Sequence, residues 1–502
     1  MKENIIIKIF FLFVTLGSPF YMKDLTHLNY RERTEVSIDT ITMYDSDNPN
    51  EKVDWIKVDN IYYFFLPKSF NLRHLVVDFN DFSVSYVNID NGIIQKRLYN
   101  KSENSFVMFE NFLFEIGNQT YSVKILQSDI DSIFIDLDHG DDDYQNIIES
   151  FNHSVSKSGN AFVQNEKIRI EKMRGRGHST WKRPKKPFQI KFDQKKSLFG
   201  MKEAKTWNLL TNTWDGSLSR NAMWFNLANY MDMEYTPEFK PVDLYINHKY
   251  KGSYLLTSKV EVKENRVEIG DNDFLIEISN HPGDYDFISK NGFQYKVDNP
   301  DASEANIQNI KEYIDHIETM IFDPSVSIEE LEKYIDIDSA IQFYFIQEVS
   351  LNYDVLRGSN YFYMQDGKLH FGPIWDMDNT MNRSYNYAKL DEDYILNNSS
   401  LQERMVKNYY ASLMKRNDYK ERTEQYFREH LFLLKNIIRD LDDYHSLISS
   451  SADMNYTLFS YTNMKQEQQR RWIKNDNSFD DSYQIFRNSL LQRYDYLKKK
   501  YY

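Results

Sequence analysis

Hydrophobic spacing divides the chain into a strand-rich beginning and a helix-rich end. Between about residues 35 and 135, short runs of branched and aromatic side chains alternate with turn residues, as in a β-sandwich. We therefore predict a β-sandwich-like accessory domain over residues 30–135. Its predicted strands are Val36–Met43, Ile61–Leu66, Leu75–Val77, Phe82–Val87, Phe106–Phe114 and Thr120–Ile125.

Strands and helices mix between residues 136 and 400, and helices dominate from 401 to 502. The predicted strands are Phe188–Phe192, Trp207–Thr211, Pro241–Ile246, Gly252–Thr257 and Phe274–Ser279. Apolar positions at helical spacing predict helices over Leu218–Met231, Ile307–Ile321, Ile328–Tyr334, Asp338–Leu351, Ser400–Lys415, Tyr419–Leu441 and Phe486–Tyr501.

A predicted β-hairpin over residues 361–374 gathers candidate chemistry. Aromatic and apolar runs flank Asp366-Gly367, which is a strong tight-turn signal. Asp354 precedes the hairpin, and Asp376 and Asp378 follow it. Because a hairpin brings its ends together, these carboxylates can share one pocket. Protein kinases place a base Asp and a metal-binding Asp on either side of two strands in this way. The alternative is that Asp354 caps a turn and that Asp376 and Asp378 lie on a solvated strand end.

Composition excludes several classes of function. The 502 residues carry a net charge of −14, which argues against general binding to nucleic acid or anionic membrane. Cysteine is absent, which removes disulfides, thiolate metal sites and a cysteine nucleophile. Aromatic residues make up 16% of the chain, so most of it is expected to be globular.

The N-terminus resembles an export signal. A basic start, an apolar core over Ile5–Phe13 and small residues near Gly17-Ser18 predict a signal peptide or signal anchor over residues 1–22. We expect a secreted or cell-surface protein with no membrane association beyond that anchor.

A basic segment interrupts the acidic chain. Between Lys172 and Lys205 there are twelve Lys or Arg and two acids. This local excess of positive charge predicts an anion site, with a solvated basic hairpin as the alternative. Glycines would let the backbone approach phosphate oxygens there. The candidate anion-binding residues in this segment are Arg174, Arg176, Gly177, His178, Ser179, Lys186 and Lys191. Arg220 is a further candidate, because it lies near the start of a predicted helix and helix N-termini favour anions.

Two lysines and one acidic turn leave alternatives open. Lys191 lies inside an apolar alternation beside the glycine-containing loop, where kinases carry their nucleotide lysine, and Lys186 is the alternative. The acidic turn Asp136–Asp143 lacks the ligand pattern of a calcium loop, and we interpret it as a solvated turn.

From about Ile133 to its C-terminus, the chain resembles the CotH kinase family, which is named for a bacterial spore-coat protein and related to atypical protein kinases. The matching segments, in order, are Gly175–Trp181 (GRGHSTW), a Lys-Pro strand, Asp215–Asn221 (DGSLSRN), Tyr245–Thr257 (YINHKYKGSYLLT) and Phe371–Asp378 (FGPIWDMD). The first and last of these motifs, taken together and in this order, are specific.

The resemblance implies an enzyme that uses ATP and Mg²⁺ to phosphorylate Ser or Thr on a partner protein. It implies that Asp354 is the catalytic-loop Asp and that Asp376 and Asp378 hold metal. Asn360 is the candidate metal-binding Asn, and Ser359 competes with it. By the same resemblance, Arg176 to Ser179 cover the phosphates and Lys191 is the nucleotide lysine.

The sequence departs from the family pattern at several positions. Asn360 lies six residues after Asp354, where the family pattern implies a metal-binding Asn at five, and no obvious Glu marks a kinase-type ion pair with Lys191. His178 stands where the family usually has Asn. Ser258 stands where an acid usually follows the LLT strand, and Glu261 is the nearest substitute.

We therefore expect an α+β fold: an atypical protein-kinase-like core (136–400), an N-terminal β-sandwich-like domain and a C-terminal helical region (401–502). The expected function is that of an exported Ser/Thr protein kinase. The alternative is a surface adhesin or binding protein on a degenerate kinase-like fold. Hydrolysis by paired carboxylates ranks last, because it assigns no role to the basic segment.

Overall fold

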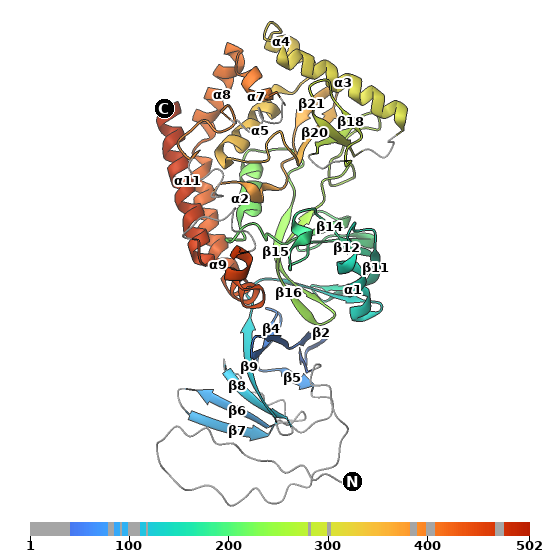
Figure 1. Cartoon of the computed structure of the whole chain (residues 1–502), viewed down its shortest axis with the longest axis vertical. Coiled ribbons are helices and arrows are strands. Elements are labelled where there is room, and N and C mark those ends of the chain that lie inside the picture. The colour runs from blue at the N-terminus through green and yellow to red at the C-terminus, as the bar shows by residue number, and fades with distance from the viewer. Residues whose placement is uncertain are drawn as a thin grey trace, which may run out of the picture. The chain divides into compact units, whose positions relative to one another are not determined.

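The computed structural model describes residues 41–78, 85–90, 93–98, 111–116, 119–279, 283–298, 303–381, 389–397, 407–466 and 476–502. The fold is mixed α/β with several sheets, as expected (Figure 1). It divides into two compact units, one within residues 1–127 with 248–250 and one within residues 128–247 with 251–502. The division precedes residue 135, where the sequence placed its boundary. The predicted signal over residues 1–22 lies outside the described residues.

The first unit contains two sheets. One has the strand order β2-β1-β5 and the other β3-β4-β9-β8-β6-β7. Phe64, Phe65 and Leu66 are fully buried, which explains why the predicted strand Ile61–Leu66 matches β4 to the residue. The strands are β1 (Thr42–Asp45), β2 (Asn48–Asp54), β3 (Ile56–Val58), β4, β5 (Leu75–Asp78), β6 (Ser85–Asp90), β7 (Ile93–Leu98), β8 (Asn111–Ile116) and β9 (Gln119–Gln127).

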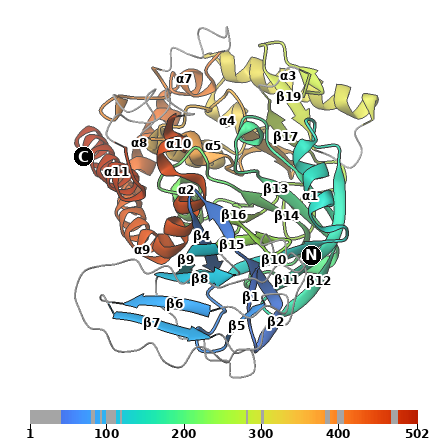
Figure 2. The same cartoon turned by 60° about the horizontal axis from the view of Figure 1, so that its bottom comes forward.

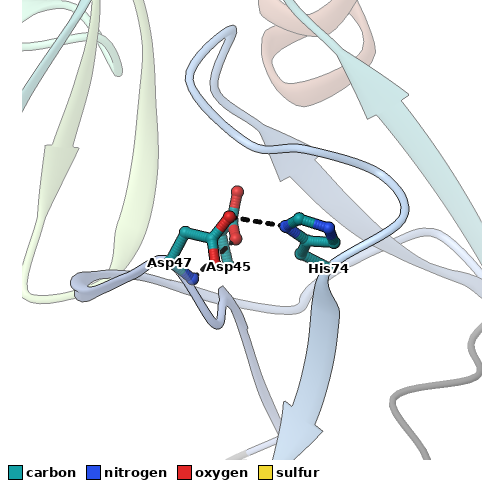
Figure 3. Close-up of side chains that lie close together, drawn as sticks. All are labelled: Asp45, Asp47 and His74. Atoms are coloured by element: carbon teal, nitrogen blue, oxygen red, sulfur yellow. Dashed lines mark hydrogen bonds and ion pairs between the residues drawn. The ribbon is translucent and has the colours of Figure 1, made fainter.

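Asp45, Asp47 and His74 form a polar cluster in this unit (Figure 3). Their possible ligand atoms lie within 4.8 Å of one another. The His74 imidazole lies 2.5 Å from the Asp47 carboxylate, and Asp45 accepts the backbone N–H groups of Asp47 and Asn71 at 2.9 and 2.6 Å. These contacts join the β1–β2 turn to the segment before β5, so the cluster has a structural explanation.

The second unit begins with a closed seven-stranded barrel, whose strands β13, β14 and β16 lie side by side in Figure 2. Its order is β10-β11-β12-β13-β14-β16-β15, and a parallel pairing of β10 with β15 completes it. The strands are β10 (Ser132–Leu137), β11 (Ser156–Val163), β12 (Glu166–Gly175), β13 (Phe188–Lys196), β14 (Ala204–Leu210), β15 (Phe239–Ile246) and β16 (Lys249–Ser258).

Strand alternation builds the barrel core and explains where the basic segment lies. Phe188, Ile190 and Phe192 are buried inside, so the residues between them face outward. Ion pairs join Lys191 to Glu171, Lys195 to Glu264 and Lys196 to Glu166. The lysines that β13 contributes to the basic segment therefore lie on the barrel surface.

The acidic turn also has a structural role. Helix α1 (Gly140–Glu149) begins within it and carries acids in its first turn, where the helix dipole favours negative charge. Asp143 pairs with Lys157 at 2.9 Å, and hydrogen bonds from Arg169 and Ser158 hold the pKa of Asp138 well below its usual range.

A five-stranded sheet with the order β18-β19-β17-β20-β21 contains the predicted hairpin. Its strands are β17 (Leu275–Ile278), β18 (Phe287–Ile288), β19 (Gln294–Val297), β20 (Asn360–Gln365) and β21 (Lys368–Phe371). The β20–β21 turn is at Asp366-Gly367, where both residues have positive φ, as predicted. β17, remote in sequence, pairs with β20 and extends the hairpin.

Helices surround this sheet, and α9 packs against both α2 and α11 (Figure 1). They are α2 (Arg220–Tyr230), α3 (Glu304–Phe322), α4 (Ile328–Leu331), α5 (Ile337–Ser350), α7 (Tyr409–Leu413), α8 (Asn417–His430), α9 (Leu433–Phe459), α10 (Tyr461–Gln466) and α11 (Phe479–Tyr501). The single helix predicted over Tyr419–Leu441 is wrong, because α8 ends and α9 begins within it. Among the described residues, none of the helices is long and apolar enough to cross a membrane.

A buried ion pair connects α5 to the C-terminal helix. Arg493 in α11 donates to the Glu348 carboxylate at 2.6 Å and to the Glu348 carbonyl at 2.9 Å. Both residues are at most 1% exposed. Because α5 runs directly into the segment that contains Asp354, this pair helps to fix one wall of the site described next.

Candidate functional site

A cavity of about 550 Å³ lies in the second unit, between the barrel, the five-stranded sheet and the segments that flank the hairpin. Residues from four parts of the chain that are far apart in sequence border it. They are residues 176–180 and 187 between β12 and β13, residues 210–212, 214 and 221 from the end of β14 to α2, residues 277, 279, 284 and 296 around β17–β19, and residues 353, 354, 357–359, 361, 375, 376, 378 and 379 around the hairpin. Of the predicted site residues, Arg176, Gly177, His178, Ser179, Asp354, Asp376 and Asp378 line it.

The two ends of the hairpin meet at Asp354. Asn379 Nδ2 donates to Asp354 Oδ2 at 2.5 Å, and the Tyr353 N–H donates to the Asn379 carbonyl at 3.2 Å. Leu351, the C-cap of α5, has φ of +53°, which turns the chain sharply into this segment. The predicted convergence of acids from both ends is therefore present in the fold.

Helix α2 positions the second acidic segment. Asn221 Oδ1 accepts the Met377 N–H at 2.8 Å, and the Asn221 side chain is buried. Asp376 itself has φ of +56°, a left-handed conformation that is uncommon for Asp and that directs the short turn after it. Asp376 is exposed at the cavity, whereas Asp378 is only 7% exposed.

Asn360 does not line the cavity, unlike its competitor Ser359. Its Oδ1 accepts the Leu356 N–H at 2.9 Å, and its Nδ2 donates to the carbonyls of Asp354 and Gly358 at 3.0 and 2.5 Å. The expectation that Asn360 faces a metal is not met, because its amide braces the loop from Asp354 to Asn360. Ser359 Oγ lies 3.4 Å from Asp376 Oδ2.

Close packing explains the GRGHSTW motif. A Cβ on Gly175 would lie 2.4 Å from the buried Trp181 ring, so only Gly fits there. Gly177 has φ of +79°, and a Cβ on it would meet Thr180 Oγ1 at 2.5 Å. The two glycines let the loop fold tightly, which brings Arg176, His178 and Ser179 to the cavity.

Arg176 is the basic residue of this loop with the clearest place in the cavity. Its guanidinium lies 5.6 Å from the centroid of the Trp375 ring. Burial lowers the pKa of Arg176, and the Asp376 charge opposes that shift. Since arginine stays protonated at any physiological pH, Arg176 brings a partly desolvated positive charge next to Asp376.

Lys191 and Arg174 do not line the cavity, contrary to expectation. Lys191 Nζ pairs with Glu171 at 2.9 Å on the outer face of the barrel, and Arg174 donates to Gln189 Oε1 at 2.9 Å. Side chains alternate between the two faces of a strand. Because Phe188, Ile190 and Phe192 point into the barrel core, Gln189 and Lys191 between them point outward.

Lys186 and Arg220 also lie away from the cavity. Lys186 Nζ donates to the Trp181 carbonyl at 2.7 Å. Arg220 is buried against Asp215, and its Nε donates to the Met381 carbonyl at 3.0 Å. Asp215 accepts the N–H groups of Ser219 and Arg220 at 2.8 and 2.7 Å, so the pair organises the start of α2.

Three cavity residues that form a row across the sheet were not among the predicted site residues. Lys296, Glu277 and Tyr361 are cross-strand neighbours on β19, β17 and β20. Tyr361 donates its hydroxyl to Glu277 at 3.0 Å, and burial raises the pKa of Glu277 to about 7. The one sequence signal that could have indicated Glu277 as a site residue is its charge inside the otherwise apolar run Leu275–Ile278. Only the pairing of distant strands shows where Glu277 points.

The structure also shows where two residues connected with the departures from the family pattern lie. His178 Nε2 lies 3.7 Å from Asp284, which also pairs with Lys296. Glu261 is buried beside Lys259 at 3.1 Å and does not line the cavity.

The cavity is acidic and lined by many oxygen atoms that could bind a metal ion. Five carboxylates border it (Glu277, Asp284, Asp354, Asp376 and Asp378), against the three cations Arg176, Lys296 and Arg357. A polyphosphate would meet net negative charge there unless a divalent cation accompanied it. Carboxylate and hydroxyl oxygens suit Mg²⁺, which is commonly held by one or two carboxylates together with substrate phosphates.

Acids at both ends of a hairpin, facing a glycine-containing basic loop, form the arrangement expected of a kinase-type protein. The comparison with protein families agrees: the chain belongs to the CotH kinase family, whose model, described as CotH kinase protein, matches residues 173–497. The match begins in β12 and ends in α11, and so covers the cavity-lining residues. A comparison with curated proteins found no significant match.

Proposed function

We propose that this protein is an ATP- and Mg²⁺-dependent protein kinase that transfers the γ-phosphate to a Ser or Thr hydroxyl of a secreted or surface protein. The observation that carries the proposal is the single cavity shared by Asp354, Asp376 and the loop from Arg176 to Ser179. Phosphoryl transfer needs little covalent chemistry beyond positioning and charge stabilisation, and these residues can supply both.

Asp376 and Asp378 are the residues that would hold Mg²⁺, with the Ser359 hydroxyl beside them. Bound there, the ion would neutralise phosphate charge. This role explains why acids outnumber cations in a cavity meant for an anionic substrate.

Asp354 is the proposed proton acceptor. In the reaction, an oxygen–phosphorus bond forms between the acceptor hydroxyl and the γ-phosphorus. The bond from that phosphorus to the bridging oxygen breaks, ADP leaves, and the hydroxyl proton passes to Asp354. The hydrogen bond from Asn379 orients the Asp354 carboxylate, and Arg176 adds positive charge on the nucleotide side.

The partner follows from the proposed export. The basic and apolar pattern of residues 1–22 supports a signal peptide or anchor, so the protein substrate would be another exported protein. Export is tested directly by fractionating the source cells and probing each fraction with an antibody. Detection in the cytosol alone would contradict this part of the proposal.

The enzymatic proposal is tested with purified protein, labelled ATP and Mg²⁺. Asp354→Asn and Asp376→Asn should each lower phosphate transfer about 10³-fold through lost proton acceptance and charge stabilisation. Asp142→Asn is the matched control, because Asp142 is exposed in α1 and does not line the cavity. Full transfer by both cavity variants, or no nucleotide binding by the wild type, would refute the proposal.

One observation favours the alternative of a surface binding protein on a kinase-like fold. Asn360 is engaged within its own loop, so a second metal ligand of the protein-kinase type does not face the cavity at that position. A binding protein should capture its partner equally well as wild type and as Asp354→Asn in the absence of nucleotide, and should transfer no phosphate in either form.

A further inference from the structure

Arg357 borders the cavity three residues after Asp354, and the proposed reaction gives it no role so far. Its guanidinium lies 4.1 Å from the centroid of the Tyr353 ring. Its Nη1 is buried out of contact with solvent and has no hydrogen-bond acceptor among the described residues. The described residues also offer the side chain no ion pair.

The other cavity cations differ from Arg357 in this respect. Lys296 is paired with Asp284, and Arg176 lies within the influence of the Asp376 charge. A buried guanidinium N–H without an acceptor is costly, and such groups are rare in folded proteins. The planar fork of an arginine matches the oxygens of a phosphate, which would relieve that cost.

The loop fixes Arg357 relative to the proposed proton acceptor. The backbone carbonyl of Asp354 accepts the N–H groups of Arg357 and Gly358 at 2.9 and 3.2 Å. Asn360 Nδ2 donates to the same carbonyl at 3.0 Å. Asp354 and Arg357 therefore belong to one tightly hydrogen-bonded turn, and the aromatic ring of Tyr353 restricts the guanidinium further.

We propose that Arg357 binds the terminal phosphate of the nucleoside triphosphate, the group that is transferred, and holds it beside Asp354. This inference rests on the proposed kinase function. In that role the cation contacts oxygens that a diphosphate lacks, so its contribution should depend on the third phosphate.

Calorimetric titration of the full chain with Mg²⁺ and either a non-hydrolysable ATP analogue or ADP tests the inference. Arg357→Met should weaken binding of the analogue about 10- to 100-fold, the effect of one charge-assisted hydrogen bond, and leave ADP affinity within about twofold. Arg357→Lys, which keeps the charge, should lose less. Arg439→Met is the matched control, because Arg439 is exposed in α9 and does not line the cavity.

The outcomes separate the two proposals. Suppose that the wild type binds both nucleotides. If Arg357→Met then weakens the binding of the ATP analogue and of ADP equally, or weakens neither, the inference fails and the proposed function stands. An effect confined to the KM of a protein substrate would also overturn the inference, since Arg357 would then contact the acceptor. If the wild type binds neither nucleotide, both proposals fall. Thermal unfolding of Arg357→Met and Arg357→Lys checks folding, and the lysine variant decides the matter if the methionine variant is unfolded.

Discussion

Arg493→Ala removes the cation of the buried pair between α11 and α5. Arg493 donates four hydrogen bonds: to the carbonyls of Leu390, Glu392 and Glu348 at 3.0, 2.7 and 2.9 Å, and to the Glu348 carboxylate at 2.6 Å. After truncation, three carbonyls lose a donor. Glu348 keeps its backbone donors at Tyr394 and Ile395, both at 2.8 Å, but loses its counter-charge.

The magnitude follows from these contacts. Three hydrogen bonds to neutral carbonyls contribute about 1 kcal/mol each. Deleting one partner of a buried ion pair costs about 3–5 kcal/mol, because it leaves an uncompensated buried charge. The two residual donors on Glu348 hold the ion-pair cost near the lower end of that range, at about 3 kcal/mol. With the three carbonyl hydrogen bonds added, we expect a total loss of about 6 kcal/mol, a large part of the roughly 5–15 kcal/mol that stabilises a folded protein.

Urea unfolding monitored by circular dichroism and by tryptophan fluorescence measures this loss. The matched control is Arg487→Ala on the same helix. Arg487 donates to Asp442 at 2.8 and 3.2 Å, but both side chains are about one-third exposed. Solvent screens that pair, so the control should lose less than about 1 kcal/mol.

A loss for Arg493→Ala no larger than that for Arg487→Ala would refute the reasoning, because burial would then not distinguish the two pairs. The charge-free double variant Glu348→Gln with Arg493→Met provides a second check. It should be more stable than Arg493→Ala, since no unpaired charge remains buried. If it is less stable, the cost arises from lost packing and hydrogen bonds instead.

Three further predictions concern the cavity and its surroundings. Burial raises the pKa of Glu277 from 4.5 to about 7, so its contribution to stability is complete below pH 4.5 and is lost as the pH rises through 7. Glu277→Gln should flatten that loss in urea melts with chelator present; an unchanged pH profile would contradict the assignment. Asn360→Ala removes three loop hydrogen bonds and should cost about 2–3 kcal/mol and most phosphate transfer, and wild-type turnover would show that the loop needs no such support. Lys191→Met should leave nucleotide affinity within about twofold by calorimetry, whereas a tenfold loss would restore Lys191 as the nucleotide lysine.

Local sequence signals predicted the elements whose cause is local. The Asp366-Gly367 turn, the hairpin around it and helix α5 lie close to their predicted places, because turn chemistry and apolar spacing act over a few residues. The resemblance to the CotH kinase family, carried by two short motifs in order, is confirmed by the family match. A motif is a pattern of residues close together in the sequence, so it can be recognised without knowledge of the fold.

The same signals could not show which basic residues border the cavity, and they could not identify the β17–β19 residues that form one of its walls. Alternation along β13 predicts that Lys191 faces away from Phe188 and Ile190, yet which outward face borders the cavity depends on how the barrel closes. Glu277 reaches the cavity because β17 pairs with β20, across more than eighty residues of chain.

The sequence by itself determined the hairpin, the acids at its two ends and the family. Only the tertiary structure decided which cations join those acids: Arg176, Lys296 and Arg357 border the cavity, whereas Lys191, Lys186 and Arg220 do not. The physical reason is that a side chain's charge is a property of its own residue. The partner that satisfies that charge is chosen by strand pairing and barrel closure between segments far apart in the chain.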